Sequence, residues 1–381
     1  MAIFFTIFFT IYAALNYYIF SKGWSSLAAL PHLRIAYLIV FLALSLSYIA
    51  AKFMTKILPH TLYDIMLWIG SFWFALMLYF FLAAVLIDLL RLLNFWFGIF
   101  PSFINNNFEQ VKLFTAGIVV LLTLVTVAAG YINTTIIKVK DLNLTMRKGK
   151  SNLKELKIAM ASDIHLSPMD NEKFLTGIVD KLNSLNPDII LIPGDLFDDE
   201  AFILKQRNIG PALLKLKAKY GVYACTGNHE FINHIDSAVA FMESYNIKVI
   251  RDSSLLIENA FNLVSRDDRA KKQFTGKDRK PLEDIMESVD KSYPIILLDH
   301  TPFALNEAQN NGVDLQLSGH THHGQIFPAN LITKMIYEMS WGYLKKGNTQ
   351  YYVSCGAGTW GPRVRLGSRS EVVNINLRFV D

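Results

Sequence analysis

The stretch VYACTGNHEF, residues 222–231, decides the predicted fold, because it joins a short apolar run to a polar turn. Its first part, Val222–Thr226, has the length and apolar character of a buried strand. Gly227 follows directly, and a glycine lets a turn bring its backbone close to a ligand without a side chain in the way. Asn228, His229 and Glu230 come next. The stretch therefore predicts a buried strand that ends in a turn able to carry chemistry.

Other polar motifs follow predicted strands in the same way. Each taken alone could be a helix cap or a satisfied histidine, but together they form a specific pattern. The carboxyl ends of parallel strands meet at one edge of a sheet, so these side chains are expected to converge. Carboxylate, imidazole and amide oxygen suit divalent cations, and a pair of cations needs one shared carboxylate. The motifs are Asp163-Ile164-His165, Gly194-Asp195, Asp299-His300 and Gly319-His320-Thr321-His322.

The region that carries these motifs, residues 153–381, alternates short apolar runs with amphipathic stretches, which predicts a layered α/β domain. The segment Ser265–Lys280 is dense in Asp, Arg and Lys and is expected to be an exposed loop. Helices are expected at Asn171–Leu185, Ala201–Lys219, Ala238–Tyr245 and Leu282–Val289. Strands are expected at Leu156–Ala161, Asp188–Ile192, Val222–Thr226, Lys248–Ile250, Ile295–Leu298, Leu315–Leu317, Gln350–Ser354 and Glu371–Leu377.

The first third of the chain, residues 1–137, is far more apolar than the rest. It contains four runs, each close to the roughly 20 residues that a helix needs to cross about 30 Å of hydrocarbon. A helical domain in water is the alternative, but these runs leave almost no polar face. We therefore expect a four-helix transmembrane bundle, then a linker over residues 138–152. The runs are Ala2–Phe20, Ile35–Ala51, Ile65–Ile87 and Leu113–Ile132.

Basic residues near the ends of the predicted spans indicate which side of the membrane carries the second region. An even number of spans places the N-terminus and residues 153–381 on the same side. The positive-inside bias favours a cytoplasmic position for that side, because more basic residues fall there. They are Lys52, Lys56, Lys138, Lys140, Arg147, Lys148 and Lys150, against Lys22, Arg34, Arg91 and Lys112 on the opposite side.

Bulk composition excludes some classes of partner. The net charge of +5 is modest, and the basic residues form no stripe interleaved with aromatics, so nucleic acid is not an expected partner. No protein partner can be inferred. The two cysteines, Cys225 and Cys355, lie in apolar runs, which indicates small core residues rather than a disulfide or a nucleophile.

The order of the motifs, from DxH through GD, GNHE and an isolated His to GHTH, resembles that of the calcineurin-like metallophosphoesterases over about Lys157 to Leu377. The resemblance implies two divalent cations, Mn²⁺ first, with Fe²⁺ or Zn²⁺ as alternatives. Carried over position by position, it implies that Asp195 bridges the two ions. Asp163, His165 and His322 would hold one ion, and Asn228, His300 and His320 the other.

The same resemblance implies a mechanism. A hydroxide shared by the two metals attacks phosphorus in line, with no covalent phosphoenzyme. His229 would face the phosphate, where it stabilises charge or protonates the leaving oxygen. Glu230 has two open interpretations: it orients His229, or it serves the N-terminus of the helix that follows.

Two further stretches bear on the substrate. Leu331–Leu344 places Leu331, Ile332, Met335, Ile336 and Met339 at helical spacing, as a wall for an acyl chain, a membrane contact or an ordinary helix packed on the sheet. The glycine-rich run from Gly356 to Arg365 predicts a loop. In it, Arg363 and Arg365 could bind phosphate or be solvated, and Trp360 is a third candidate substrate contact.

The run GHTHHGQ and the C-terminal loop look most like bacterial exported phosphodiesterases and UDP-2,3-diacylglucosamine pyrophosphohydrolases of lipid A synthesis. The leading hypothesis is therefore an enzyme of the bacterial inner membrane that cleaves a lipid-linked pyrophosphate on the cytoplasmic side. An outward-facing domain would instead favour a phosphodiester of the cell envelope. A hypothesis of another class is a sensor that binds metal and ligand without turnover, although the complete ligand set speaks against it.

Overall fold

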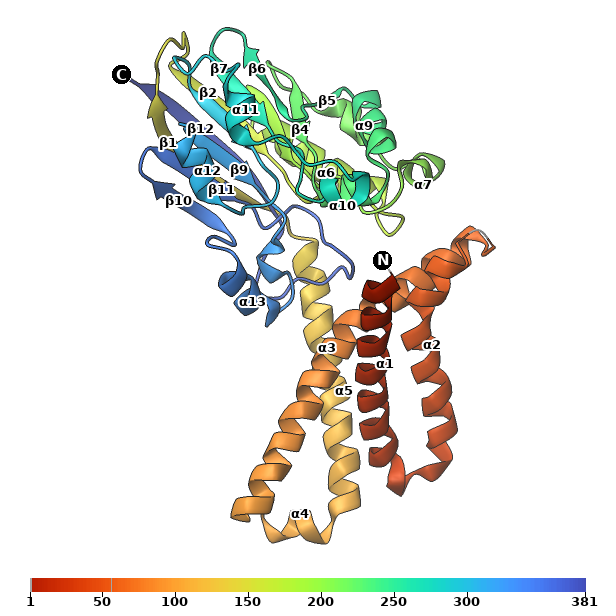
Figure 1. The fold of residues 1–381 in the computed structure, drawn as a ribbon. Coiled ribbons are helices and arrows are strands. Elements are labelled where there is room, and N and C mark those ends of the chain that lie inside the picture. The colour runs from red at the N-terminus through yellow and green to blue at the C-terminus, as the bar shows by residue number, and fades with distance from the viewer. Residues whose placement is uncertain (1, 56) are drawn as a thin grey trace. The chain divides into compact units, whose positions relative to one another are not determined.

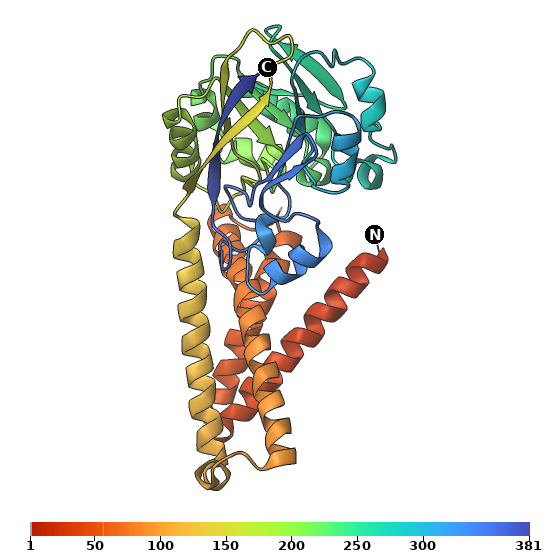
Figure 2. The ribbon, with the colours of Figure 1, turned by 90° about the vertical axis from the view of Figure 1, so that its left-hand side faces the viewer.

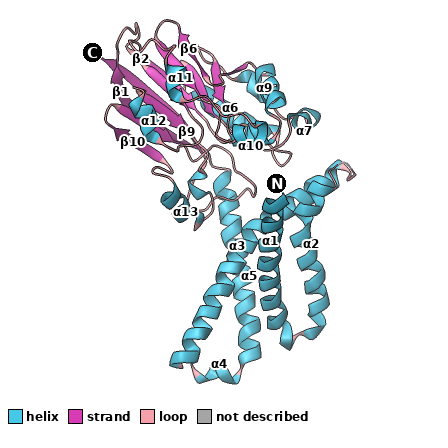
Figure 3. Cartoon of the chain, in the orientation of Figure 1, coloured by secondary structure: helices cyan, strands magenta, loops and turns pink. Residues whose placement is uncertain are grey.

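The computed structural model describes residues 2–55 and 57–381, so Lys56, one of the basic residues counted above, lies outside the described residues. The chain forms two compact units, which are described separately. The first is helical and comprises the chain up to Ile132 together with Gly361–Val364. The second comprises Asn133–Trp360 and Arg365–Asp381. The β-strands belong to the second unit, as Figures 1 and 3 show.

The first unit consists of long apolar helices. Three segments of the described residues have the length and hydropathy of a membrane span: Pro31–Phe53, His60–Phe97 and Phe108–Thr134. The fourth predicted span lies on α1, a continuous helix of 25 residues, and its crossing of the membrane stays a prediction. The helices are α1 (Ala2–Ser26), α2 (Arg34–Phe53), α3 (His60–Phe97), α4 (Ser102–Asn106) and α5 (Phe108–Thr134), with 3₁₀ turns η1 (Leu27–Ala29) and η2 (Pro31–Leu33).

Three of these helices share a core. Tyr12 and Ile19 of α1, Phe41 of α2 and Trp73 of α3 pack together and are buried. A polar contact crosses the same core, because Trp73 Nε1 donates to Asn16 Oδ1 at 2.9 Å. Such a hydrogen bond stabilises helix association where lipid would otherwise leave both groups unpaired.

The second unit contains two six-stranded sheets in the described residues. The first has the order β1-β12-β2-β3-β4-β5 and the second β10-β11-β9-β8-β7-β6. The strands are β1 (Lys138–Arg147), β2 (Glu155–Met160), β3 (Ile189–Pro193), β4 (Val222–Cys225), β5 (Ile247–Val249), β6 (Ser253–Ile257), β7 (Phe261–Ser265), β8 (Ile295–Leu298), β9 (Leu315–Ser318), β10 (Gly342–Lys346), β11 (Thr349–Val353) and β12 (Glu371–Val380).

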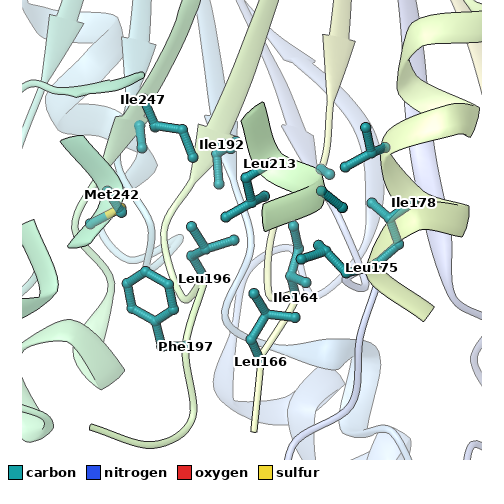
Figure 4. Close-up of a cluster of buried hydrophobic side chains, with 14 of the residues drawn as sticks. Ile164, Leu166, Leu175, Ile178, Ile192, Leu196, Phe197, Leu213, Met242 and Ile247 are labelled. Carbon is teal, nitrogen blue, oxygen red and sulfur yellow. The ribbon is translucent and has the colours of Figure 1, made fainter. Parts of the chain in front are cut away.

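Helices connect the strands, and several of them cover the outer faces of the two sheets. The helices are α6 (Glu172–Ser184), α7 (Ala201–Gln206), α8 (Asn228–Ile232), α9 (Ile235–Ser244), α10 (Lys271–Thr275), α11 (Leu282–Met286), α12 (Leu305–Asn310) and α13 (Ala329–Ile336), with 3₁₀ turns η3 (Pro211–Lys215) and η4 (His322–Gly324). Apolar side chains of α6, η3 and α9 pack on the first sheet, as Figure 4 shows for Leu175, Leu213 and Met242. α11 and α12 pack on the second sheet. A third cluster, with Ile158 and Leu298, lies between the sheets, so the unit is a layered α/β sandwich as expected.

The predicted linker over residues 138–152 is wrong for its first ten residues. They form β1, which pairs in parallel with β12. The pairing runs from Lys138, opposite Glu371, to Arg147, opposite Val380, and Figure 2 shows the two strands side by side. The strand is an edge strand: Leu144 and Met146 are buried, while its charged residues Lys138, Lys140, Asp141 and Arg147 are exposed. An edge strand with charged residues on its solvent face is easily mistaken for a linker when only its sequence is known.

This strand also changes the charge count used for orientation. Lys138, Lys140 and Arg147 lie within β1 and therefore belong to a folded domain rather than to a short loop. The positive-inside bias acts through short loops near the spans, so these residues carry little topological information. The side of the membrane that carries the second unit thus remains a proposal.

Two other predictions in this unit fail for local reasons. The helix expected over Ala201–Lys219 is broken into α7 and η3, because Gly210 adopts a φ of 133° directly before Pro211. The loop expected over Ser265–Lys280 is not exposed at its start. Asp267 is buried and forms an ion pair with Arg251 at 2.9 Å, so a dense run of charges is buried because partners come from elsewhere in the chain. Both cysteines are free and buried, as expected.

Candidate metal centre

The polar motifs lie where predicted, directly after β2, β3, β4, β8 and β9. The backbone there is unusual, because several of the residues that carry these side chains have positive φ angles. Values between 47° and 70° occur at Asp163, His165, Asp195, His320 and His322. Non-glycine residues rarely adopt this region, and such strain clusters at functional sites. The fold therefore holds these side chains in place at an energetic cost.

The first group of side chains comes from three motifs. His165 Nε2 and His322 Nε2 lie 3.0 Å apart, and His322 Nε2 lies 3.5 Å from Asp163 Oδ1. All three residues are buried. Burial lowers the pKa of His322 well below its ordinary value, and His165 adds to this effect. The imidazole is thus held neutral, which is the form that binds a metal ion.

The second group lies beside the first. His300 Nε2 is 3.1 Å from Asp195 Oδ2, and His320 Nδ1 is 2.8 Å from Asn228 Oδ1. The other nitrogen of His300, Nδ1, contacts the carbonyl oxygen of Pro193 at 2.7 Å, which fixes the ring so that Nε2 faces the centre. Asn228 and His320 are partly exposed, so this side of the centre is open to substrate.

Asp195 joins the two groups. Its Oδ2 atom lies 3.7 Å from His165 Nε2 and 3.1 Å from His300 Nε2. Three sets of His and Asp atoms here lie close enough to hold a metal ion. The chemistry of the donors agrees, because two imidazole nitrogens facing each other at 3.0 Å beside carboxylates suit a shared divalent cation. The residues present therefore fit a two-metal centre with Asp195 in the middle.

Glycines allow the motifs to approach this closely. A Cβ atom on Gly227 would collide with the carboxylate of Asp195, and one on Gly319 would collide with the side chains of Asp163 and Ser162. The requirement at these positions is space rather than φ. The carboxylate of Asp163 is further held by the backbone N–H of His320, which donates to Oδ1 at 2.8 Å.

His229 lies at the edge of the centre, on the first turn of α8. Its Nδ1 atom is 2.9 Å from Asp198 Oδ1, and its backbone N–H donates to Asp195 Oδ1 at 2.9 Å. Burial alone lowers the pKa of His229, but the carboxylates of Asp195 and Asp198 outweigh it and raise the pKa to about 9. A protonated imidazole that faces substrate can donate a proton.

Asp198 is a site residue that the sequence reasoning missed. It lies between two histidines, because its Oδ1 is also 3.5 Å from His165 Nδ1. Burial raises the pKa of Asp198, but hydrogen bonds and electrostatic interactions with His165 and His229 outweigh it and lower the pKa below its ordinary value. Its signal in the sequence is weak: an acidic residue three positions after Asp195, in a run of three Asp and Glu residues of the kind that solvated turns also contain.

Asp198→Asn is expected to move the basic limb of the pH–rate profile to lower pH. The loss of one carboxylate lowers the pKa of His229, so its protonated form disappears at a lower pH than in the parent. The profile of kcat between pH 6 and 10 measures the shift, with Asp199→Asn as the neighbouring control. An unchanged basic limb would mean that Asp198 does not set the protonation of His229.

The contacts of Glu230 favour the second interpretation given above, in which this residue serves the N-terminus of the helix that follows. It is fully buried, and its carboxylate accepts from the backbone N–H groups of Gly227 at 2.7 Å, Asp195 at 3.0 Å and Leu196 at 2.8 Å. The bond to Gly227 is the capping-box contact at the start of α8. Glu230 thus ties two motifs together through their backbone.

Arg365 was predicted as a substrate contact, and the structure corrects this. Its side chain is fully buried, and Nη2 donates to the carbonyl oxygens of Cys355 and Gly358, both at 2.6 Å. The same nitrogen lies 3.2 Å from His322 Nδ1. Arg365 therefore holds the glycine-rich loop against His322 instead of binding phosphate. The other two predicted substrate contacts are not fully buried, since Trp360 is exposed and Arg363 is half-buried.

Comparisons with known proteins agree with this geometry. The profile described as calcineurin-like phosphoesterase matches residues 156–324. A metallophosphoesterase of Aquifex aeolicus is 31% identical over 226 residues, which are 59% of this chain and 85% of that protein. A metallophosphoesterase of Helicobacter pylori is 33% identical over 228 residues, and the match spans only 60% of its length.

A relative from an animal matches nearly the whole chain. A protein of Danio rerio described as a transmembrane protein with metallophosphoesterase domain is 29% identical over 359 residues, which are 90% of this chain and 80% of that protein. An alignment of this length includes helices of the first unit as well as the sheets of the second. The similarity therefore covers both the apolar helices and the metal centre.

Proposed function

We propose that this chain hydrolyses a phosphoester or pyrophosphate bond of a lipid-linked substrate at the membrane. The premise is that the chain belongs to the calcineurin-like metallophosphoesterase family, a family of metal-dependent phosphoesterases. The observation that carries the reaction type is the position of Asp195, between the two groups of ligands. A single carboxylate shared by two cation sites is typical of two-metal sites that stabilise both the attacking and the leaving oxygen of an in-line displacement at phosphorus.

The ligand assignment follows the two groups. Asp163, His165 and His322 would hold one divalent cation, Asn228, His300 and His320 the other, and Asp195 both; Mn²⁺ is the first candidate, with Fe²⁺ or Zn²⁺ as alternatives. When bound, the cations supply a Lewis acid that activates water and neutralises charge on the phosphoryl oxygens. The protein itself keeps the ligands in place through the buried contacts of Glu230 and Arg365.

His229 supplies the proton that the leaving oxygen needs. Its Nδ1 atom faces Asp198, which leaves Nε2–H to donate to a bound phosphoester. The partial exposure of His229, Asn228 and His320 gives the substrate an approach from one side of the centre.

An exposed apolar surface beside the centre supports a lipid-linked substrate. α13 begins shortly after the last metal motif, and Leu331, Ile332, Met335 and Ile336 on it are exposed, Met335 to 87%. The helix is therefore not packed on the sheet through these residues; Met339, predicted for the same stripe, is buried beyond its end. Apolar side chains on a short helix in a membrane-bound chain suit contact with acyl chains.

The double substitution Ile332→Glu and Met335→Glu is expected to reduce kcat/KM on a vesicle-borne phospholipid substrate about tenfold, because each exposed side chain loses the energy of burial against acyl chains. Hydrolysis of soluble bis(p-nitrophenyl) phosphate should stay unchanged. Leu214→Glu, on an exposed position of η3, is the control. An equal loss on both substrates would point to a damaged fold, and no loss on either would contradict acyl contact through α13.

The specific substrate that the sequence resemblance suggests is UDP-2,3-diacylglucosamine, which would be cleaved to UMP and a lipid monophosphate. UMP release by the purified full chain tests it directly. This substrate requires a cytoplasmic active site, as in a protein of the bacterial inner membrane. A periplasmic signal from a reporter fused after Asp381 would favour a phosphodiester of the cell envelope instead, and metal binding without any turnover would favour a sensor.

A further inference from the structure

The helices of the first unit line a half-open cavity that none of the chemistry above uses, and we propose that it binds one anionic phospholipid. Its volume is about 560 Å³. It is lined mostly by apolar side chains from four helices, among them Ile19 of α1, Phe41 of α2, Phe80 of α3 and Val119 of α5. Ligand sites in proteins are commonly apolar cavities of about this size that contain a few placed polar groups.

The cavity exists because α5 does not join the core of the other helices. The buried cluster around Tyr12, Phe41 and Trp73 is built from α1, α2 and α3, and among the described residues none of its members comes from α5. The interior face of α5 instead lines the cavity, from Phe108 to Leu124. A gap of this kind in a membrane-spanning bundle is filled by lipid or by another helix.

Charged groups at one end of the cavity decide between these occupants. Among the described residues that line it, three are cationic, Lys22, Arg91 and Lys112, and one is acidic, Asp88, which gives 3 − 1 = +2. Lys22 Nζ lies 2.5 Å and Arg91 Nη1 3.7 Å from Asp88, so one carboxylate is shared by two cations. Lys112 pairs with Glu109 at 2.8 Å, and counting that residue leaves +1.

A net positive cluster at the mouth of an apolar cavity is complementary to a lipid that carries a phosphate. Basic pockets between transmembrane helices bind anionic head groups in this way. A second helix would instead need a small or apolar surface at this end and would leave the excess positive charge without a counter-charge in the bilayer. The charges therefore favour an anionic phospholipid over a second copy of the chain.

The dimensions of the cavity fit an acyl chain. From Lys112 to Leu124, α5 rises about 18 Å, close to the thickness of one leaflet of a hydrocarbon layer about 30 Å thick. Arg91 of α3 and Lys112 of α5 both lie over the ring of Phe108, at 5.7 and 5.2 Å from its centroid, and aromatic rings at the end of a span are typical of the interface. The phosphate would bind the cluster, and one acyl chain would lie along α5.

The proposal does not depend on the substrate of the metal centre, and it is tested on the full chain. Native mass spectrometry of protein extracted from nanodiscs of dioleoyl phosphatidylglycerol or dioleoyl phosphatidylcholine should show one retained phosphatidylglycerol and at least tenfold less phosphatidylcholine. The double variant Arg91→Gln, Lys112→Gln should lose this preference. Lys52→Gln, in the last turn of α2 and outside the cavity lining, is the control and should keep the preference for phosphatidylglycerol.

A second variant separates charge from shape. Ala116→Phe places a ring inside the cavity and keeps every charge, so it should also abolish retention of the lipid. Hydrolysis of bis(p-nitrophenyl) phosphate checks that each variant is folded. Equal retention of both lipids, a dimer mass without lipid, or full retention in both the double variant and Ala116→Phe would overturn the proposal.

Discussion

Replacing Asp195 by asparagine is expected to reduce kcat on bis(p-nitrophenyl) phosphate by about a thousandfold or more, which is roughly 4 kcal/mol of transition-state stabilisation. The substitution keeps the size of the side chain and the acceptor for the backbone N–H of His229. It removes the negative charge that lies near both His165 and His300. Neither cation site then has its shared ligand, so the loss should be far greater than for a residue outside the centre.

Metal content and activity should change together in this variant. Inductively coupled plasma mass spectrometry should find about two ions in the parent and fewer in Asp195→Asn. Asp180→Asn, on the exposed side of α6, is the matched control and should retain both metal and rate. If Asp195→Asn kept two ions and most of its activity, the assignment of Asp195 as the shared ligand would be wrong.

The motifs could be located from the sequence because each follows a short apolar strand. The strands β3, β4, β8 and β9 are buried throughout and β2 over its last three residues, Ile158–Met160, so most of these sequences are short apolar runs with a clear end. A polar residue directly after such a run must lie at the edge of the sheet. The convergence of Asp163, Asp195 and His300 therefore followed from strand ends alone.

What the sequence did not reveal depends on contacts distant along the chain. Arg365 seemed available to phosphate because a glycine-rich loop predicts exposure, but it is buried by carbonyl oxygens and by His322. Asp198 was not predicted as a site residue, because only the position of His229 beside it shows its role. β1 has charged residues on its outer face, and only its pairing with β12 identifies it as a strand. In each case the role of the residue or strand depends on a contact with a segment that is distant along the chain. The local sequence does not show which segment that is.

The apolar helices show the same limit in another form. Hydropathy predicted the long helices of the first unit well, because a span must be apolar along its whole length. It could not show that α1, α2 and α3 share a core while α5 lines a cavity, since all of them are similarly apolar. Helix association in lipid depends on a few specific contacts, such as Trp73 with Asn16, rather than on overall hydropathy.

His229→Gln is expected to reduce kcat on a dialkyl phosphodiester by between about a hundredfold and ten-thousandfold, because glutamine cannot give a proton to an alkoxide. The loss should depend on the leaving group. p-Nitrophenolate leaves without protonation, so the same variant should lose about tenfold or less on bis(p-nitrophenyl) phosphate. A plot of log kcat against the pKa of the leaving alcohol should therefore be steeper for the variant than for the parent.

His234→Gln is the matched control, because His234 lies five residues further along the chain and is exposed. It should leave both slopes unchanged. Metal content shows whether His229 is a proton donor or a metal ligand. If His229 donates a proton and is not a ligand, the His229→Gln variant should bind as much metal as the parent. An equal loss on both classes of leaving group, with both ions retained, would instead mean that His229 stabilises charge on the phosphoryl oxygens without transferring a proton.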